Sequence, residues 1–91
     1  MPVLFPLGRL VATPGAIELI RSAGEDLLPT LLERHQSGDW GEVSSEDARE
    51  NEFSVRHGFR VVSSYQVAGE RLWIITEADR STTTLLLPSE Y

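Results

Sequence analysis

The residues with the clearest capacity for chemistry form one short turn near the end of the chain, Asp79-Arg80-Ser81-Thr82. Arg80 offers a forked guanidinium, the hydroxyls of Ser81 and Thr82 can donate hydrogen bonds, and Asp79 could orient the guanidinium. Asp79, Arg80 and Ser81 are therefore candidate binding residues for an anion. The same four residues also suit a solvated hairpin turn that leads into a threonine-rich strand. The sequence leaves both interpretations open.

His35, Ser64 and Trp40 are the other candidates. An imidazole suits acid–base catalysis near neutral pH, but His35 also continues the apolar stripe of a helix from Leu31, which favours a structural role. The sequence around Ser64 has no nucleophile-elbow pattern, which disfavours a serine hydrolase. Trp40, bracketed by glycines, could stack on a partner or close over the edge of a core.

The composition excludes several kinds of site. The chain has no cysteine and no lysine, which removes thiolate chemistry, cysteine-ligated zinc and lysine Schiff bases. His35 and His57 are not at a metal-ligand spacing, so we expect neither a metal nor a cofactor. A formal net charge of −6 disfavours non-specific binding to nucleic acid. No apolar run is long enough for a membrane span or shaped like a signal peptide, so we expect a cytoplasmic protein.

The elements that must position these residues follow from caps and breakers. The 91 residues predict a single domain over 1–91. Helices are expected from Thr13 to Gly24, from Asp26 to Gln36 and over 45–57, and strands over 59–67, 71–77 and 82–87. Residues 3–12 would form at most an edge strand, because Pro6 and Gly8 weaken it. This predicts an α+β fold, with two or three N-terminal helices packed on a three- to four-stranded antiparallel sheet that ends in a C-terminal β-meander.

The middle strand has apolar side chains on both faces, with Leu72 and Ile74 on one and Trp73 and Ile75 on the other. Both faces should therefore be covered, one by helices and the other by the N-terminal segment or a second subunit. The chain is expected to be a monomer or a homodimer.

Two segments and the chain's ending resemble a family of small uncharacterised bacterial proteins that are often found on plasmids and other mobile elements. They are Arg34-His35-Gln36-Ser37-Gly38-Asp39-Trp40-Gly41, the block from Trp73 to Pro88, and Leu87-Pro88-Ser89-Glu90-Tyr91. The resemblance runs from about Leu7 onward. It implies a bacterial, cytoplasmic, mobile-element setting and no particular activity.

The expected architecture is also similar to that of barnase and RelE-type ribonucleases. That similarity implies metal-independent RNA cleavage, with His35 as base or acid, Arg80 on the phosphate and Ser64 or Thr82 as positioning groups. The acidic charge and the lack of a matching motif count against it.

The leading hypothesis is a non-enzymatic domain that binds a protein partner through the exposed sheet face or the acidic third helix. The ribonuclease toxin is the first alternative. An acidic DNA mimic is the second, based on Glu46, Asp47, Glu50 and Glu52, although Arg49 and Arg56 interrupt these acids.

Overall fold

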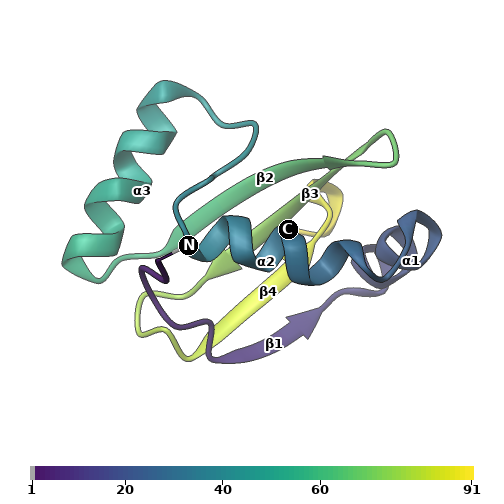
Figure 1. Cartoon of the computed structure of the whole chain (residues 1–91), viewed down its shortest axis with the longest axis horizontal. Helices are drawn as coiled ribbons and strands as arrows, with labels where there is room; N and C mark the ends of the chain where they lie inside the picture. Colours follow the sequence, from purple (N-terminus) through teal and green to yellow (C-terminus); the bar gives the residue numbers. More distant parts are fainter. Residues whose placement is uncertain (1) are drawn as a thin grey trace.

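A four-stranded sheet with the order β1-β4-β3-β2 organises the protein (Figure 1). The structure is a computed structural model that describes residues 2–91. Its strands are β1 (Arg9–Ala12), β2 (Val61–Val67), β3 (Glu70–Thr76) and β4 (Thr82–Leu86). β2, β3 and β4 form the expected antiparallel meander.

β1 lies parallel to β4, so the sheet is mixed, and the prediction of a purely antiparallel sheet was wrong. The two strands come from opposite ends of the chain, so no short turn dictates their relative direction. Long-range contacts fix it instead. The Thr83 hydroxyl donates to the Leu7 carbonyl at 2.7 Å. Gly8 has a φ of +67°, and a Cβ there would lie 2.4 Å from the Arg80 carbonyl oxygen, so only glycine allows this approach.

Three α-helices precede the meander, as expected, and their ends follow local capping rules. They are α1 (Pro14–Ala23), α2 (Leu27–Gln36) and α3 (Ser45–His57), and a 3₁₀ turn, η1 (Pro88–Glu90), follows β4. The side chains of Thr13 and Ser44 accept hydrogen bonds from the first turns of α1 and α3. Gly58 ends α3 in the left-handed conformation. No helix within residues 2–91 is long and apolar enough to cross a membrane.

The main core lies between one face of the sheet and the pair α1 and α2 (Figure 1). Its buried side chains are Ala16, Leu19, Ile20, Leu31, Tyr65, Val67, Leu72, Ile74 and Leu85. A smaller cluster of Phe5, Trp40 and Val61 joins the N-terminal segment to the side of α3. α3 stands beside β2 rather than over the sheet's centre. The second face is covered only in part: Ile75 and Leu86 are buried there, whereas Trp73 is partly exposed, so the expectation that both faces are covered holds fully for the helix face and in part for the other.

The outer edge of β2 is sealed by the chain itself. The Asn51 side chain donates to the Val62 carbonyl at 2.8 Å and accepts from the Val62 N–H at 3.1 Å. The next outward residue, Ser64, donates its N–H to the Trp40 carbonyl and accepts from the Glu42 N–H. These contacts satisfy an edge that would otherwise attract another strand.

Candidate functional site

His35 is fully buried beneath the sheet and belongs to a chain of hydrogen bonds. Its Nδ1 contacts the Ser63 hydroxyl, and its Nε2 lies 2.9 Å from the Thr76 hydroxyl. Thr76 in turn contacts Thr83 at 2.7 Å, and Thr83 donates to the Leu7 carbonyl. The sequence indicated that His35 lies on a core stripe, but the other members of its hydrogen-bond network come from three strands and the N-terminal segment.

The Leu7 carbonyl, which ends this series of hydrogen bonds, fixes which group donates in the bonds that lead to it. A carbonyl can only accept, so Thr83 donates to Leu7, and Thr83 must then accept from Thr76. Thr76 has used its proton and so accepts from Nε2–H of His35. The remaining nitrogen, Nδ1, accepts the Ser63 proton. The network therefore requires a proton on Nε2, and the neutral imidazole is the state in which Ser63 also donates to Nδ1.

The surroundings of His35 favour the same neutral state. Burial, together with the positive charge of Arg80, lowers the pKa of His35 to about 4. The rings of Phe5 and Trp40 pack against the imidazole in edge-to-face contacts, with ring centroids 5.2 and 6.1 Å away. Because both nitrogens are engaged and no part of the side chain is exposed, His35 cannot reach a bound substrate in this conformation.

Arg80 directs its guanidinium into the protein rather than toward solvent. Nη1 donates to the carbonyls of Phe59 and Glu77 at 2.7 and 3.1 Å, and Nη2 donates to the Ser54 carbonyl at 3.0 Å. The guanidinium also lies over the Phe5 ring, 5.3 Å from its centroid. These contacts hold the C-terminal end of α3 against the β3–β4 turn.

The other members of the predicted anion site form a turn. Asp79 accepts from the N–H and the hydroxyl of Ser81, at 3.0 and 2.6 Å, and these bonds lower the pKa of Asp79. Thr82 lies next to Ser81 at the start of β4. No contact joins Asp79 to Arg80 among the hydrogen bonds and ion pairs of residues 2–91. The geometry is that of the solvated turn, and an anion clamp at these residues stays a prediction.

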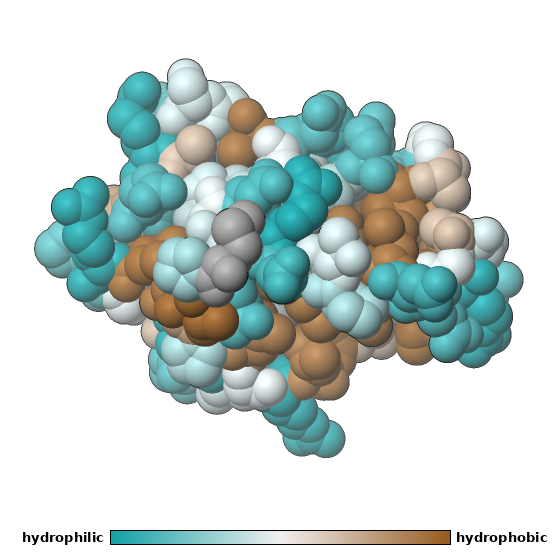
Figure 2. Space-filling view, in the orientation of Figure 1, coloured by the Kyte–Doolittle hydropathy of each residue, from teal (hydrophilic) through white to brown (hydrophobic). Residues whose placement is uncertain are grey.

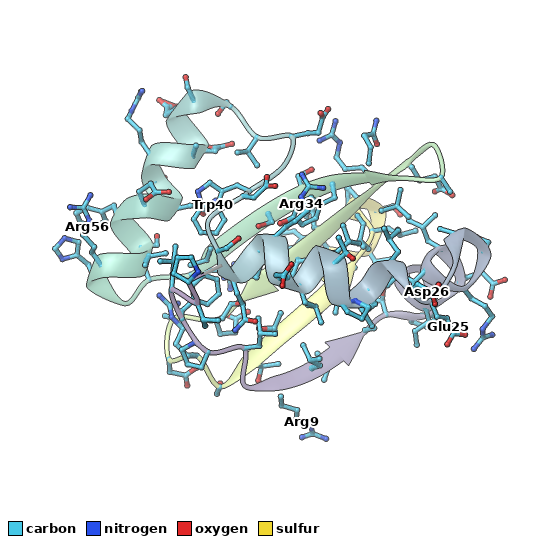
Figure 3. The ribbon with its side chains drawn as sticks, viewed as in Figure 1. Arg9, Glu25, Asp26, Arg34, Trp40 and Arg56 are labelled. Carbon is cyan, nitrogen blue, oxygen red and sulfur yellow. The ribbon has the colours of Figure 1, made fainter. Side chains whose placement is uncertain are left out.

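Trp40 and Ser64 are buried as well. Trp40 is 5 % exposed, stacks on Phe5 and donates its indole N–H to Glu52 at 3.1 Å, in the space between α3 and α2 (Figure 3). Ser64 accepts from the Arg71 guanidinium at 2.7 Å on the face of the sheet opposite His35. The structure thus places both His35 and Arg80 in contact with the Phe5 ring, while Ser64 and Thr82 lie elsewhere.

A groove that the sequence analysis did not identify lies between α3 and the second face of the sheet, with a volume of about 560 Å³. Its floor consists of Val62, Trp73 and Ile75, with Asn51 and Ser54 of α3 beside it. The Tyr91 ring closes one end through an edge-to-face contact with Trp73, at 5.6 Å between centroids. The alternation of β3 indicated an apolar second face, but only the position of α3 turns that face into a groove.

The charged residues of the groove differ in how far they are engaged. Arg60 pairs with Glu77 at 3.2 Å and donates to the Tyr91 hydroxyl, and Arg71 donates to Ser64 and to a main-chain carbonyl. Asp47 and Glu50 of α3 line the groove and take part in no ion pair among residues 2–91. The carboxylates of α3 in the groove are therefore available to bind a ligand.

A second hollow of about 450 Å³ adjoins the groove across Glu50 and Ser54, which line both. It contains Phe53 and Phe59, which are each 53 % exposed and stacked at 5.8 Å. Adjoining exposed apolar side chains often mark a surface that binds a partner. Within residues 2–91, no three His, Asp or Glu side chains converge as metal ligands would.

No protein-family model, no curated protein and no solved structure matches this chain. The resemblance to small mobile-element proteins is therefore still a prediction.

Proposed function

We propose that this protein is a binding domain for a segment of a partner protein, and that the groove between α3 and the second sheet face is the binding site. The observation that carries the proposal is the combination of an apolar floor with an acidic wall whose carboxylates are unpaired. Binding sites are typically concave, mostly apolar and furnished with a few polar groups that fix orientation. This groove has that composition.

The chemistry of the groove defines the partner segment. Val62, Trp73 and Ile75 favour an aromatic or branched aliphatic side chain on the floor. Asp47 and Glu50 favour a lysine or arginine beside it. The net charge of −6 adds a long-range attraction for a basic partner. The adjoining hollow at Phe53 and Phe59 offers a second apolar anchor point.

The alternatives receive less support from the geometry. A ribonuclease would need His35 or Arg80 at an accessible cleft, but both are engaged inside the protein. A DNA mimic would need a continuous acidic ridge, but Glu52 is held by the Trp40 indole and Arg49 interrupts the row on α3. A role in mobile-element biology stays a prediction without a structural argument.

Selection from a displayed library of short random peptides tests the proposal. We expect enriched peptides to combine an aromatic or aliphatic residue with lysine or arginine. Replacing both carboxylates, in the variant Asp47→Asn/Glu50→Gln, should lower the affinity for a selected peptide roughly tenfold, which calorimetry measures. Added salt should also lower the affinity of the native protein for the peptide. Glu18→Gln on α1 is the matched control, because Glu18 is exposed and lies outside the groove.

Two outcomes would contradict the proposal. One is enrichment of acidic peptides. The other is binding that neither the double variant nor Trp73→Ala reduces. Growth arrest of a bacterial host on expression, relieved by His35→Ala with the fold intact by circular dichroism, would favour the ribonuclease instead.

A further inference from the structure

The two edge strands of the sheet differ in whether their outward backbone groups have hydrogen-bond partners. The β2 edge is sealed by Asn51 and the segment after Trp40, whereas nothing within residues 2–91 covers the outer edge of β1. On its inner side, β1 bonds to β4: Arg9 N–H donates to the Ser81 carbonyl at 2.9 Å and Thr13 N–H donates to the Leu85 carbonyl at 3.0 Å.

In a parallel ladder, alternate residues of a strand bond to the neighbour. Arg9, Val11 and Thr13 therefore face β4, and Leu10 and Ala12 direct their N–H and C=O groups outward. Such an edge is a ready template for another strand.

Apolar surface accompanies this open edge. Leu10 is 46 % exposed and Val11 is 37 % exposed. Leu10 and Ala12 lie on the helix face of the sheet, because their partners in β4 are Thr83 and Leu85, which are both buried. Next to Ala12 is an apolar groove of about 360 Å³, also lined by Ile17, Ile20, Arg21, Glu25, Leu28, Pro29 and Leu85. Figure 2 shows apolar surface along this edge, and Figure 3 shows Arg9 pointing away from the strand.

We propose that a second copy of this chain occupies the β1 edge, through antiparallel β1–β1 pairing about a twofold axis at Val11. In this register the outward groups of Leu10 bond to those of Ala12 in the second copy, and the reverse. The two Val11 side chains meet at the axis. An interface of this kind must be complementary to itself, because both copies present the same surface.

The side chains meet that requirement at this register. Opposite residues of paired strands share a face, so Leu10 of one copy lies against Ala12 of the other and enters the groove beside it. A large side chain thus meets a small one, twice. Moving the axis to Leu10 would set the two leucines against each other and leave both grooves empty.

Charge favours the same register. Arg9 of one copy comes opposite Thr13 of the other, whose hydroxyl contacts the exposed Glu90 carboxylate. Arg9 has no ion pair among residues 2–91, so it is free to approach Glu90 of the second copy. The like charges of the two Arg9 side chains are kept apart. This surface lies at the sheet edge opposite α3, so the dimer does not depend on the peptide groove.

Light scattering during size-exclusion chromatography, over a range of protein concentrations, tests the pairing. We expect twice the mass of one chain at high concentration. Leu10→Pro removes an outward N–H and the side chain that packs against Ala12 of the second copy, but no bond to β4, so it should leave the circular dichroism spectrum unchanged and give the mass of a single chain. Phe53→Lys is the matched control: it removes a similarly exposed apolar side chain far from β1 and should leave the dimer intact.

A cysteine at the axis gives a second, independent readout. The native chain has no cysteine, so Val11→Cys introduces a single thiol. In the proposed register the two Val11 positions form a non-hydrogen-bonded pair with Cα atoms about 4.5 Å apart, a separation that a disulfide spans. We expect Val11→Cys to form a covalent dimer on mild oxidation, and Arg9→Cys to remain largely uncrosslinked because its counterpart lies far along the strand.

A native protein that keeps the mass of one chain at the highest concentration tested would overturn the proposal. So would a dimer that survives Leu10→Pro, or crosslinking that is no faster at position 11 than at position 9. If Leu10→Pro fails to fold, the crosslinking comparison still decides. Peptide binding by a protein that stays monomeric would leave the proposed function standing and remove only the dimer.

Discussion

At the His35 imidazole, both ring nitrogens lie within hydrogen-bond distance of strand hydroxyls, from Ser63 and Thr76. The terminal acceptor at Leu7 makes the donation one-way, so the neutral ring protonated at Nε2 is the only state that satisfies every member. A protonated ring would place a donor against Ser63, which would then have to turn its proton away. Protonation of His35 therefore reverses this buried hydrogen bond and leaves the Ser63 hydroxyl proton without its acceptor.

The free energy of unfolding should consequently depend on pH through His35. Its pKa is about 4 in the folded protein and 6.5 when unperturbed, so between these values the unfolded chain binds a proton that the folded one does not. Stability is complete above the unfolded value and falls as the pH drops through this window, by about 3 kcal/mol in total. Urea denaturation at several pH values measures this loss, and nitrogen chemical shifts of the ring measure the tautomer.

Two variants separate this effect from the titration of other groups. His57→Gln should keep the pH-dependent loss, because His57 lies on the surface at the end of α3. His35→Gln should be less stable near neutral pH by about 1–3 kcal/mol, because it leaves buried hydroxyls imperfectly paired, and should lack the loss between the two pKa values. An unchanged loss in His35→Gln would refute the assignment.

At the scale of elements, Arg80 joins α3 to the β3–β4 turn. Its guanidinium bonds to the carbonyls of Ser54 and Phe59, at the C-terminal end of α3, where a cation also complements the helix dipole. Arg80 itself has a φ of +61°, a left-handed conformation that favours glycine. Backbone strain and side-chain bonding therefore act in opposite directions at this position.

Substitutions at Arg80 should separate these two contributions. Arg80→Ala loses the side-chain bonds and keeps the strain, so we expect a loss of about 2–3 kcal/mol in the free energy of unfolding. Arg80→Gly loses the same bonds but relieves the strain, so it should be more stable than the alanine variant by about 0.5–1 kcal/mol. Thermal or urea denaturation measures both, and an alanine variant as stable as the native protein would show that the three bonds contribute nothing.

Among the helices and strands, some features could be predicted from the sequence and others could not. The helix ends were predictable because their signals are local: Thr13 and Ser44 cap the turns that follow them, and Gly58 ends α3. The parallel pairing of β1 with β4 was not, because it depends on contacts between opposite ends of the chain.

Long-range contacts also limited prediction of the candidate site. His35 could be placed on a core stripe by its spacing from Leu31, but its hydroxyl partners could not. The groove could not be predicted for the same reason, because its wall and floor come from separate elements. The role of Asn51 could not be predicted either, because its partner Val62 lies on β2, in a separate element.

At the scale of the whole molecule, the mixed topology leaves the short β1 strand at one edge and the self-sealed β2 strand at the other. A sheet of this size gains stability if its open edge is paired, and pairing with an identical edge requires no second gene product. The groove and the open edge then lie on different sides of the molecule. A dimer would present two peptide grooves, which favours partners with repeated basic segments through an avidity effect.

Dimerisation also makes stability depend on protein concentration. If folded chains associate and unfolded chains do not, each tenfold increase in concentration above the dissociation constant stabilises the folded dimer by about 1.4 kcal/mol. The thermal midpoint of the native protein should therefore rise with concentration in calorimetry, while that of Leu10→Pro should stay constant because the outward N–H of Leu10 is removed. Phe53→Lys should follow the native protein. A native midpoint that is the same at all concentrations would mean that the folded chain does not associate over this range, and would contradict the β1–β1 dimer.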